Sequence, residues 1–359
     1  MEFKKAKKDS ESLKNSWLSP ARFETAITKN RNNQLSTTSK NIKIVWNQDI
    51  FRSGGIFYAI KYAKQMEKYN FNLLTSQKLN LIKQIYLLKL SIEKDKLLIK
   101  QAELSLKNIN INIKMIQENY LAGLANITDL NQIFVTRDTK ISSILSLKNG
   151  LKQKEIELKK LSNKKFKIPK IPLLTEAEYI QQNINLKTLL SKSNSTYAKE
   201  KATVSSYLPK LTLNLMAGHT KFESDLSIQN YNSNNWSAGL SLSIPIDYNY
   251  HSNIESAKIE YLKSKLEIKD KKNELKQNYQ KSISNIQFFK EKIKISKQIQ
   301  DSYQTLLNIV KEKYKEGLKT IYDIESLENS VKIEELEIKI QQLNIKNEKL
   351  KLYFDIKND

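Results

Sequence analysis

Apolar residues follow a helical period over one long segment of the chain. Between residues 81 and 120 they recur at steps of three and four, with Lys, Glu, Gln and Asn between them and Asp95 as the one interruption. This spacing predicts a heptad-like seam for packing side by side with another helix along its whole length. The seam residues are Leu81, Ile85, Leu88, Ile92, Ile99, Ala102, Leu106, Ile109, Ile113, Ile116 and Tyr120.

Glycine and proline are absent from two long stretches, residues 56–122 and residues 246–316. Because these two residue types interrupt helices, each stretch predicts a nearly continuous helix. At about 1.5 Å per residue such helices reach roughly 90 to 100 Å, which ordinary globular domains do not contain. With their return arms, the expected long helices lie at about 56–122, 127–163, 252–316 and 321–355.

Other segments alternate with a period of two, which is typical of strands with one apolar face. We expect a first pair of strands at about 20–28 and 41–51, joined by the polar loop Lys29–Lys40. A second pair is expected at about 209–222 and 236–247, joined by the loop Glu223–Asn235. The apolar positions of the second pair are Leu211, Leu213, Leu215, Leu240, Leu242, Ile244 and Ile246.

An internal repeat organises the whole chain. The segment Tyr120-Leu-Ala-Gly-Leu-Ala-Asn-Ile-Thr-Asp-Leu130 recurs as Tyr314-Lys-Glu-Gly-Leu-Lys-Thr-Ile-Tyr-Asp-Ile324. The chain is therefore expected to use one unit, a strand pair plus a helical hairpin, twice, in residues 1–168 and 169–359. Lys167–Pro172 links the halves, and a capping box from Thr175 to Glu178 opens a helix at about 175–206.

The repeated segment predicts the tip of each helical hairpin. Gly123 and Gly317 are suited to end a helix in the left-handed conformation. Thr128 or Thr320, together with the nearby aspartate, can begin the return helix.

The composition excludes several classes of chemistry. There is no cysteine, and His219 and His251 are isolated, so no metal site, cofactor or cysteine nucleophile is expected. No phosphate loop, nucleophile elbow or paired catalytic carboxylates occur, which argues against an enzyme. The net charge of +23 includes only four arginines, so we interpret it mainly as lysine-rich, solvated helix faces.

Membrane entry, if it occurs, must use the strands, because no apolar run reaches the length of a spanning helix. A sheet in lipid has to close on itself, and four strands per chain cannot close. Two copies would supply 8 strands and three copies 12. Trp17, Trp46 and Trp236 all lie in or beside expected strands, as interfacial aromatic residues do.

These features together resemble the TolC family of outer-membrane efflux proteins over residues 16–355. The resemblance rests on the duplication, on Leu-Pro before the second strand pair and Ser-Ile-Pro-Ile after it, and on Tyr-x-x-Gly-Leu-x-x-Ile-x-Asp at each tip. It implies a mostly helical α+β fold, a homotrimer with a 12-stranded barrel in the outer membrane, and an α-helical barrel in the periplasm. The implied function is a passive exit duct of a tripartite efflux or type I secretion system.

The resemblance also implies partners and candidate site residues. A periplasmic adaptor and an inner-membrane pump would dock at the helical end, outer-membrane lipid would contact the apolar strand positions, and no nucleic acid is expected. Thr128 and Asp129 resemble one side of a closing contact between hairpin tips, and Tyr314 and Lys319 the other. A plain capping role for Thr128 and Asp129 is an equally good interpretation on local grounds.

Asp323 occupies the position at which the family can carry a ring of carboxylates in the pore. The second aspartate of the best-known pattern, three residues later, is replaced here by Ser326. On the strands, the polar alternate positions Thr212, Asn214, Ser241 and Ser243 should line the lumen.

The chain departs from the family pattern at its beginning. A signal peptide and most of one helix are missing before Ser16, which a wrong start site, a trimmed chain or a decayed gene copy would explain.

One alternative function remains open from the sequence. The chain can also be interpreted as a soluble, lysine-rich coiled-coil protein that binds acidic partners or nucleic acid.

Overall fold

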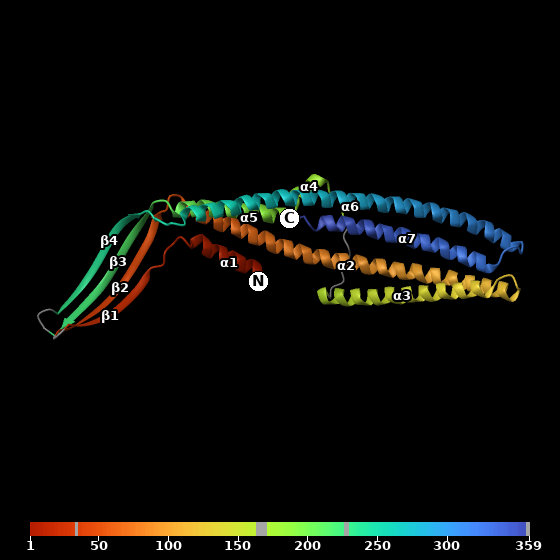
Figure 1. Cartoon of the computed structure of the whole chain (residues 1–359), viewed down its shortest axis with the longest axis horizontal. Coiled ribbons are helices and arrows are strands. Elements are labelled where there is room, and N and C mark those ends of the chain that lie inside the picture. Colours follow the sequence, from red (N-terminus) through yellow and green to blue (C-terminus); the bar gives the residue numbers. More distant parts are fainter. Residues whose placement is uncertain (33–34, 163–170, 226–229, 357–359) are drawn as a thin grey trace. The chain divides into compact units, whose positions relative to one another are not determined.

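The computed structural model describes residues 1–32, 35–162, 171–225 and 230–356. The chain forms two compact units, each assembled from segments that are far apart in sequence. Unit 1 contains Met1–Thr75 and Ile184–Lys272, and unit 2 contains Ser76–Asn183 and Asn273–Asp359. Figure 1 shows the elements in order along the chain.

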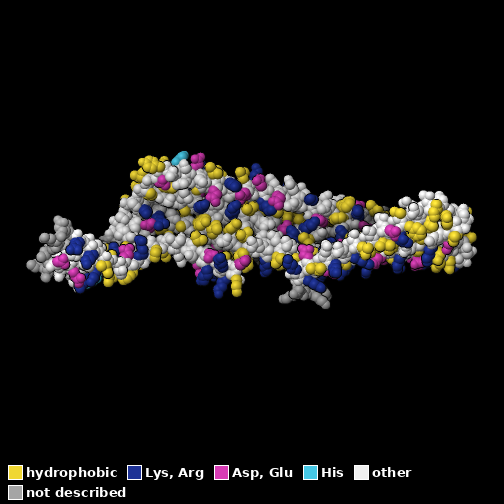
Figure 2. Space-filling view, turned by 60° about the horizontal axis from the view of Figure 1, so that its bottom comes forward, with side chains coloured by type: hydrophobic (Ala, Val, Ile, Leu, Met, Phe, Trp, Pro, Cys, Tyr) yellow, Lys and Arg dark blue, Asp and Glu magenta, His cyan; other side chains and the backbone are white. Residues whose placement is uncertain are grey.

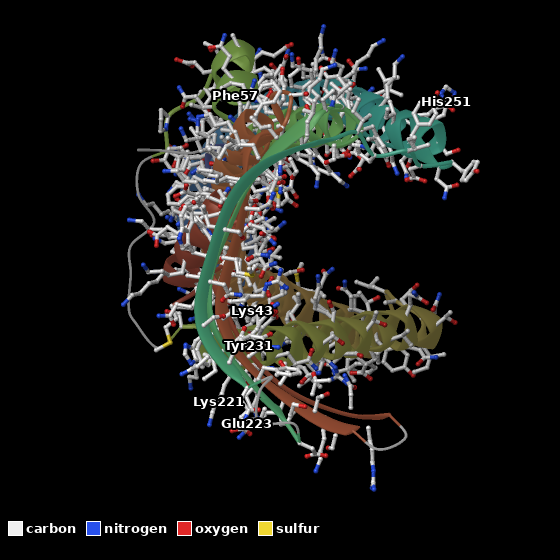
Figure 3. All side chains as sticks on the ribbon, turned by 90° about the vertical axis from the view of Figure 1, so that its left-hand side faces the viewer. Lys43, Phe57, Lys221, Glu223, Tyr231 and His251 are labelled. Atoms are coloured by element: carbon white, nitrogen blue, oxygen red, sulfur yellow. The ribbon has the colours of Figure 1, made fainter. Side chains whose placement is uncertain are left out.

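Unit 1 is built on one antiparallel sheet with the strand order β1-β2-β3-β4. Seen from its side in Figure 3, the sheet is a curved arc, with the labelled Lys43, Lys221 and Glu223 along its strands. The chain enters and leaves the sheet through helices at one end only, because β1 with β2 and β3 with β4 form hairpins at the other end. The strands are β1 (Arg22–Asn32), β2 (Leu35–Phe51), β3 (Lys210–Ser224) and β4 (Tyr231–Ser243).

The strands run further toward the hairpin ends than the alternating pattern predicts. The expected loops Lys29–Lys40 and Glu223–Asn235 are wrong over most of their length, since Lys29 pairs with Thr38 and Phe222 pairs with Tyr231. Cross-strand pairing continues here after the apolar alternation has stopped, because the ladder bonds join backbone groups of any residue type. At the other end β4 stops at Ser243, so Ile244 and Ile246 lie beyond the strand in which they were expected.

Helices of unit 1 pack through small polar side chains and through contacts between aromatic rings. Ser264 of α6 (Tyr250–Lys315) donates to Ser193 over 2.9 Å and lies 3.1 Å from Thr196, both on α5 (Ile184–Ser206). Helix α1 (Glu2–Asn15) meets α2 (Gly55–Leu121) where the rings of Phe3 and Phe71 lie 5.2 Å apart. Small side chains allow these long helices to approach closely.

Unit 2 contains the tips of both helical hairpins, with α2 from Ser76 onward joined to α3 (Ile127–Leu161) and α6 from Asn273 onward joined to α7 (Ile321–Tyr353). Its apolar core gathers around the end of α7, where the rings of Tyr86 and Phe354 stack at 5.1 Å. The Tyr179 hydroxyl donates to Asp355, whose other oxygen lies 2.7 Å from Lys83 Nζ. Burial and the neighbouring Asp355 carboxylate raise the pKa of Tyr179. The buried members of the core are Leu90, Ile171, Leu350 and Phe354.

The segment before β3 contains two helices where one was expected. The expected helix at 175–206 is broken at Asn183, which leaves the helical conformation with ψ of 122° and pairs with Ile356. The short α4 (Glu176–Gln182) begins at Thr175 with the expected capping box to Glu178. A tertiary strand-like bridge therefore overrides the local helical preference.

The element order repeats a strand pair followed by a helical hairpin, whereas each compact unit combines parts of both repeats. The boundary at 168/169 and most of the linker Lys167–Pro172 lie outside the described residues, and the division at that boundary stays a prediction. Among the described helices, none combines the length and the hydrophobicity that crossing a membrane requires.

Candidate functional site

Both hairpins of unit 2 turn through the same backbone geometry. Gly123 and Gly317 have positive φ angles of 72° and 76°, in the region that glycine adopts without strain. In each tip the following leucine amide reaches back five residues, from Leu124 to the Asn119 carbonyl and from Leu318 to the Lys313 carbonyl. These bonds satisfy carbonyl groups at the helix end and fix the turn.

The return helices begin with matching capping boxes. Asn126 caps α3 with Asp129, and Thr320 caps α7 with Asp323. The expectation that Thr128 begins α3 is wrong, because the side chain of Asn126 already accepts from the Asp129 amide at 2.9 Å. Asn126 aligns with Thr320 in the repeat, and the sequence signal for it was the preference of Asn for such positions.

The four candidate tip residues are exposed side chains of unit 2. Thr128, Asp129, Tyr314 and Lys319 all lie at or beside the turns, which Figure 1 draws at the same end of the unit. Asp129 Oδ2 accepts from the Asn126 amide at 3.2 Å, and no hydrogen bond joins it to Tyr314 in the described part of the chain. The closing contact between tips therefore stays a prediction.

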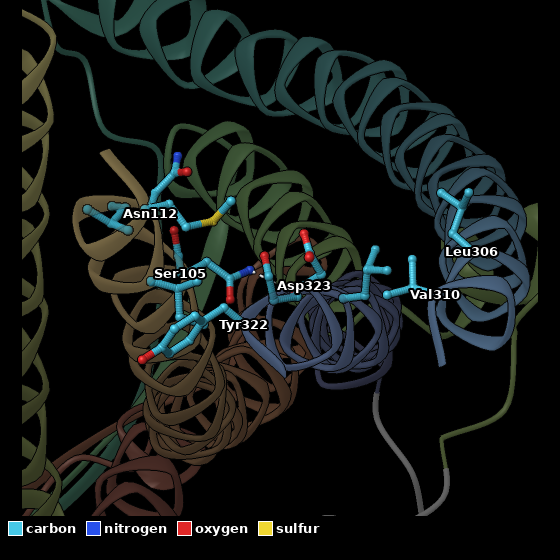
Figure 4. A pocket seen from close by; sticks show the side chains of 12 residues that line it. Ser105, Asn112, Leu306, Val310, Tyr322 and Asp323 are labelled. Carbon is cyan, nitrogen blue, oxygen red and sulfur yellow. Dashed lines mark hydrogen bonds between the residues drawn. The ribbon is translucent and has the colours of Figure 1, made fainter. Parts of the chain in front are cut away.

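A cavity of about 550 Å³ lies behind the second tip in unit 2, between α2, α6 and α7. Figure 4 shows the polar Ser105 and Asn112 from α2 and the apolar Leu306 and Val310 from α6 around it. Among the residues that line the cavity, only Asp323 carries a carboxylate.

Hydrogen bonds hold Asp323 in its ionised form. The Thr320 amide donates to Asp323 Oδ2 at 2.9 Å, and the Thr320 hydroxyl lies at the same distance. The backbone bond contributes most to lowering the pKa of Asp323 below its usual 3.8, and the charge of Lys319 adds to it, whereas partial burial opposes it. Ser326, at the place of a second aspartate, offers its carbonyl to Asn108 Nδ2 at 3.1 Å.

Sequence reasoning missed the polar contacts that hold the helices of unit 2 together. Asn108 accepts from Asn329 Nδ2 at 2.8 Å, and Gln101 donates to Glu337 at 3.0 Å, which joins α2 to α7. Asp95, the interruption of the seam, lies 2.6 Å from Lys154 Nζ and joins α2 to α3. A polar residue inside an apolar seam was the available signal, but its partner could not be read from the sequence.

The strand register divides the sheet of unit 1 into two chemically different faces. Directly paired residues lie on the same face of a sheet, and Leu211 pairs with Leu242 and Leu213 with Leu240. The register from β3 to β2 and from β2 to β1 extends this face across all four strands. We call this side the apolar face: Phe23, Ile27, Ile42, Ile44, Trp46, Leu211, Leu213, Leu215, Trp236, Leu240 and Leu242. We call the other side the polar face: Glu24, Lys43, Thr212, Asn214, Ser237, Ser241 and Ser243.

No member of the apolar face is buried by the rest of the chain. Trp236, Leu240 and Leu242 on the edge strand β4 are 80%, 64% and 69% exposed. The leucines of β3 are half-buried because β2 and β4 flank them on both sides. Ile244 and Ile246, after the strand, are exposed as well. Their contact with lipid stays a prediction.

Comparisons with known proteins give one family model for the second half of the chain and one fold for nearly all of it. Residues 178–354 match the family model described as outer membrane efflux protein. No curated protein sequence matches the chain.

Solved structures of similar fold extend over nearly the whole chain. The channel-forming protein CusC superposes with a TM-score of 0.75 at 16% identity, covering 99% of this chain and 87% of its own. The outer membrane protein VceC of Vibrio cholerae gives 0.75 at 14% identity, covering 99% and 89%. The outer membrane channel CmeC of Campylobacter jejuni gives 0.72 at 14% identity, covering 99% and 80%.

Proposed function

This chain belongs, through residues 178–354, to the outer membrane efflux protein family, whose members are channels and not enzymes; on that premise we propose that it forms a passive homotrimeric exit duct. The duct serves a tripartite efflux or type I secretion system. It carries substrates from an inner-membrane pump across the periplasm and the outer membrane to the exterior.

The two-faced sheet is the observation that carries this proposal. Eleven apolar-face residues follow one side of all four strands, and the polar face follows the other. A strand that spans a lipid bilayer needs an apolar outer side and can keep a polar side toward a water-filled lumen. A soluble sheet would cover such a face with its own helices, and none of the described helices covers this one.

The open edges of the sheet support closure by further copies. With four antiparallel strands, β1 and β4 are both edges and run in opposite directions. The β4 edge of one copy can therefore pair antiparallel with β1 of the next, and three copies close a ring of 12 strands. Closure satisfies the backbone groups of both edges, which lipid cannot do.

Unit 2 presents apolar helix surfaces that a neighbouring copy can cover. Exposed apolar residues follow one side of α6 at heptad-like steps, as Phe288, Ile295 and Ile299 do. Helix α3 has a similar stripe that includes Leu145 and Ile156, which are 62% and 60% exposed. In a ring of copies, α3 of one protomer packs against α6 of the next.

The hairpin tips are the docking surface for a periplasmic adaptor. Figure 2 shows apolar side chains gathered at the right-hand end, where the tips lie. Leu121, Leu124 and Leu318 are 85%, 80% and 69% exposed there. Exposed apolar clusters of this kind mark protein–protein contact sites.

Charged and polar tip residues close and tune the duct. Asp129 with Thr128 on one hairpin and Tyr314 with Lys319 on the other form the contacts that hold it shut. Three copies of Asp323 place a ring of carboxylates at one level of the pore. The duct is otherwise wide and passive, so the pump chooses the cargo.

The test compares the two faces of β4. We expect the full chain to form detergent-soluble trimers that conduct in planar bilayers. Leu240→Asp with Leu242→Asp should abolish insertion, because a charge on the lipid side of a strand costs about 2 to 4 kcal/mol at the midplane. Ser241→Asp with Ser243→Asp, on the polar face, should still insert and conduct. A wild-type chain that is monomeric without detergent and binds DNA would refute the duct in favour of the coiled-coil alternative.

A further inference from the structure

Basic side chains of the outer part of the sheet gather on one face. Following the apolar face toward the hairpin ends, the register places Lys40 beside Ile27 and Lys221 beside Lys40. Two and four residues beyond Ile27 on β1, the same face carries Lys29 and Arg31. We call Lys29, Arg31, Lys40 and Lys221 the basic rim.

The opposite face of the same part of the sheet carries no charge among the described residues. There the register pairs Thr28 with Ser39 and Asn30 with Thr37, and it places Asn41 beside Thr220. All of these side chains are neutral and polar. The hairpin end is thus not uniformly charged, since its positive charge lies on the apolar-face side alone.

Folding by itself does not account for the basic rim. Lys40 and Lys221 are direct cross-strand partners, and like charges in that arrangement destabilise a sheet. Glu223 lies 3.5 Å from Lys40 Nζ and 2.7 Å from Lys221 Nζ, so one carboxylate serves two ammonium groups. Lys29 and Arg31 are exposed, and no carboxylate of the described residues forms an ion pair with either. The rim therefore keeps an excess of positive charge.

We propose that the basic rim binds the phosphate groups of anionic lipids in the outer leaflet. This inference rests on the proposed function, because it takes the apolar face to lie in the hydrocarbon. Lys40 and Lys221 lie level with Ile27 at the outer border of the apolar face. Two residues along a strand advance about 6.6 Å, so Lys29 and Arg31 lie beyond this border, at head-group level. Lysine stems reach along apolar surface with their charge in the polar layer, and arginine binds phosphate through two N–H groups.

The experiment uses tryptophans of the apolar face as reporters. Trp46 and Trp236 both lie on this face, so lipid chains that touch it can quench their fluorescence. The full chain is placed in mixed micelles containing brominated phosphatidylglycerol or brominated phosphatidylcholine. We expect half-maximal quenching at a mole fraction about fivefold lower for the anionic lipid, and a smaller preference at 0.5 M salt.

Matched variants separate the rim from net charge. Lys29→Gln with Arg31→Gln removes two exposed, unpaired charges and should reduce the preference at least about twofold. Adding Lys40→Gln and Lys221→Gln should abolish it. Arg22→Gln with Lys43→Gln removes the same charge as the first pair from the polar side and should leave the preference unchanged.

Each outcome bears on a different claim. Equal quenching by both lipids in the wild type overturns the rim while leaving the membrane sheet intact. An equal loss of preference in both double variants also overturns the rim, since net charge then accounts for it. Absence of quenching by either lipid overturns the membrane sheet itself, and with it the proposed function.

Discussion

The return arms α3 and α7 begin alike and end in different surroundings. Both follow a glycine with positive φ and both open with a capping box. Yet Ile144 is the buried residue of α3, whereas buried positions recur along α7 from Ile324 to Leu352. Figure 1 shows α7 between α2 and α6, and α3 along α2. Repeated local sequence thus specifies how an arm starts, and its neighbours decide how much of it is buried.

The contacts of the two arms explain the difference. Helix α7 is held from two sides, by Gln101 with Glu337 toward α2 and by Lys311 with Glu328 at 2.9 Å toward α6. In the described part of the chain, helix α3 is held from one side only, by ion pairs toward α2, of which Asp95 with Lys154 is the most buried; the others are Lys96 with Glu155 and Glu103 with Lys148. Its exposed apolar stripe is what a second copy of the chain can cover. The comparison therefore assigns α7 to the interior of a protomer and α3 to its boundary.

Charging the stripe of α3 should have the largest effect. Leu145→Asp with Ile156→Asp removes two apolar contacts, each worth about 1.5 to 3 kcal/mol when buried, so trimer affinity should fall at least about 100-fold. Light scattering of the detergent-solubilised protein gives the stoichiometry. Thr139→Asp with Ser146→Asp, on another side of α3, should leave the trimer intact. Trimers of undiminished stability in the first variant would show that α3 is not at the boundary.

Weakening the contact between the tips should open the duct. If the proposed contact between the tips exists, Tyr314→Phe with Asp129→Asn eliminates its phenol-to-carboxylate bond, worth about 1 to 3 kcal/mol, and mean conductance in planar bilayers should rise severalfold. Asparagine can still accept the capping bond from the Asn126 amide, so α3 keeps its start. Tyr120→Phe, at the repeat-equivalent position of hairpin one, serves as the control. Conductance that matches the wild type in assembled trimers would eliminate this contact.

Breaking the most buried ion pair between α3 and α2 should loosen α3 alone. Asp95→Asn leaves the partly buried Lys154 without its carboxylate, at a cost of about 1 to 2 kcal/mol. Hydrogen exchange should then speed up in α3 and not in α7. Glu337→Gln, which neutralises the acceptor of the α2 to α7 hydrogen bond from Gln101, should produce a smaller change because α7 has neighbours on both sides. Equal acceleration in both arms would contradict the assignment.

The smallest effect is expected on ion selectivity. Asp323→Asn keeps a capping side chain but removes three charges per trimer, and should lower cation preference about twofold. Because hydrogen bonds lower the pKa of Asp323, its charge and its stabilising effect persist above pH 3.8 and are lost as the pH falls through the lowered value. Reversal potentials between pH 7 and pH 3 measure this. Selectivity that declines steadily from pH 6 would point to other groups.

Most elements could be predicted because their signals are local. The period of two predicted four strands and their apolar side, and the absence of Gly and Pro predicted two long helices, with the repeat adding their return arms. Errors arose where contacts outweighed local pattern. Pairing with Ile356 breaks the helix at Asn183, and the strand ladder continues through polar residues at both hairpins.

The candidate site likewise contains features that the sequence predicted and features that it did not. The glycine turns and the aspartate of each capping box were visible in the repeat, since such turns depend on residues a few positions apart. Contacts between segments far apart in the chain could not be predicted from the sequence. These are the ion pair of Asp95, the hydrogen bonds of Asn108 and the pairing of Lys40 with Lys221.

The sequence by itself determined which residues turn, which alternate and which line one side of a helix, because these properties depend on backbone geometry over a few residues. The tertiary structure alone decided which of two similarly begun arms is buried, which seam residue finds an ion partner and which charges share a face of the sheet. Those outcomes depend on register and on neighbours, which pattern along a single chain does not contain.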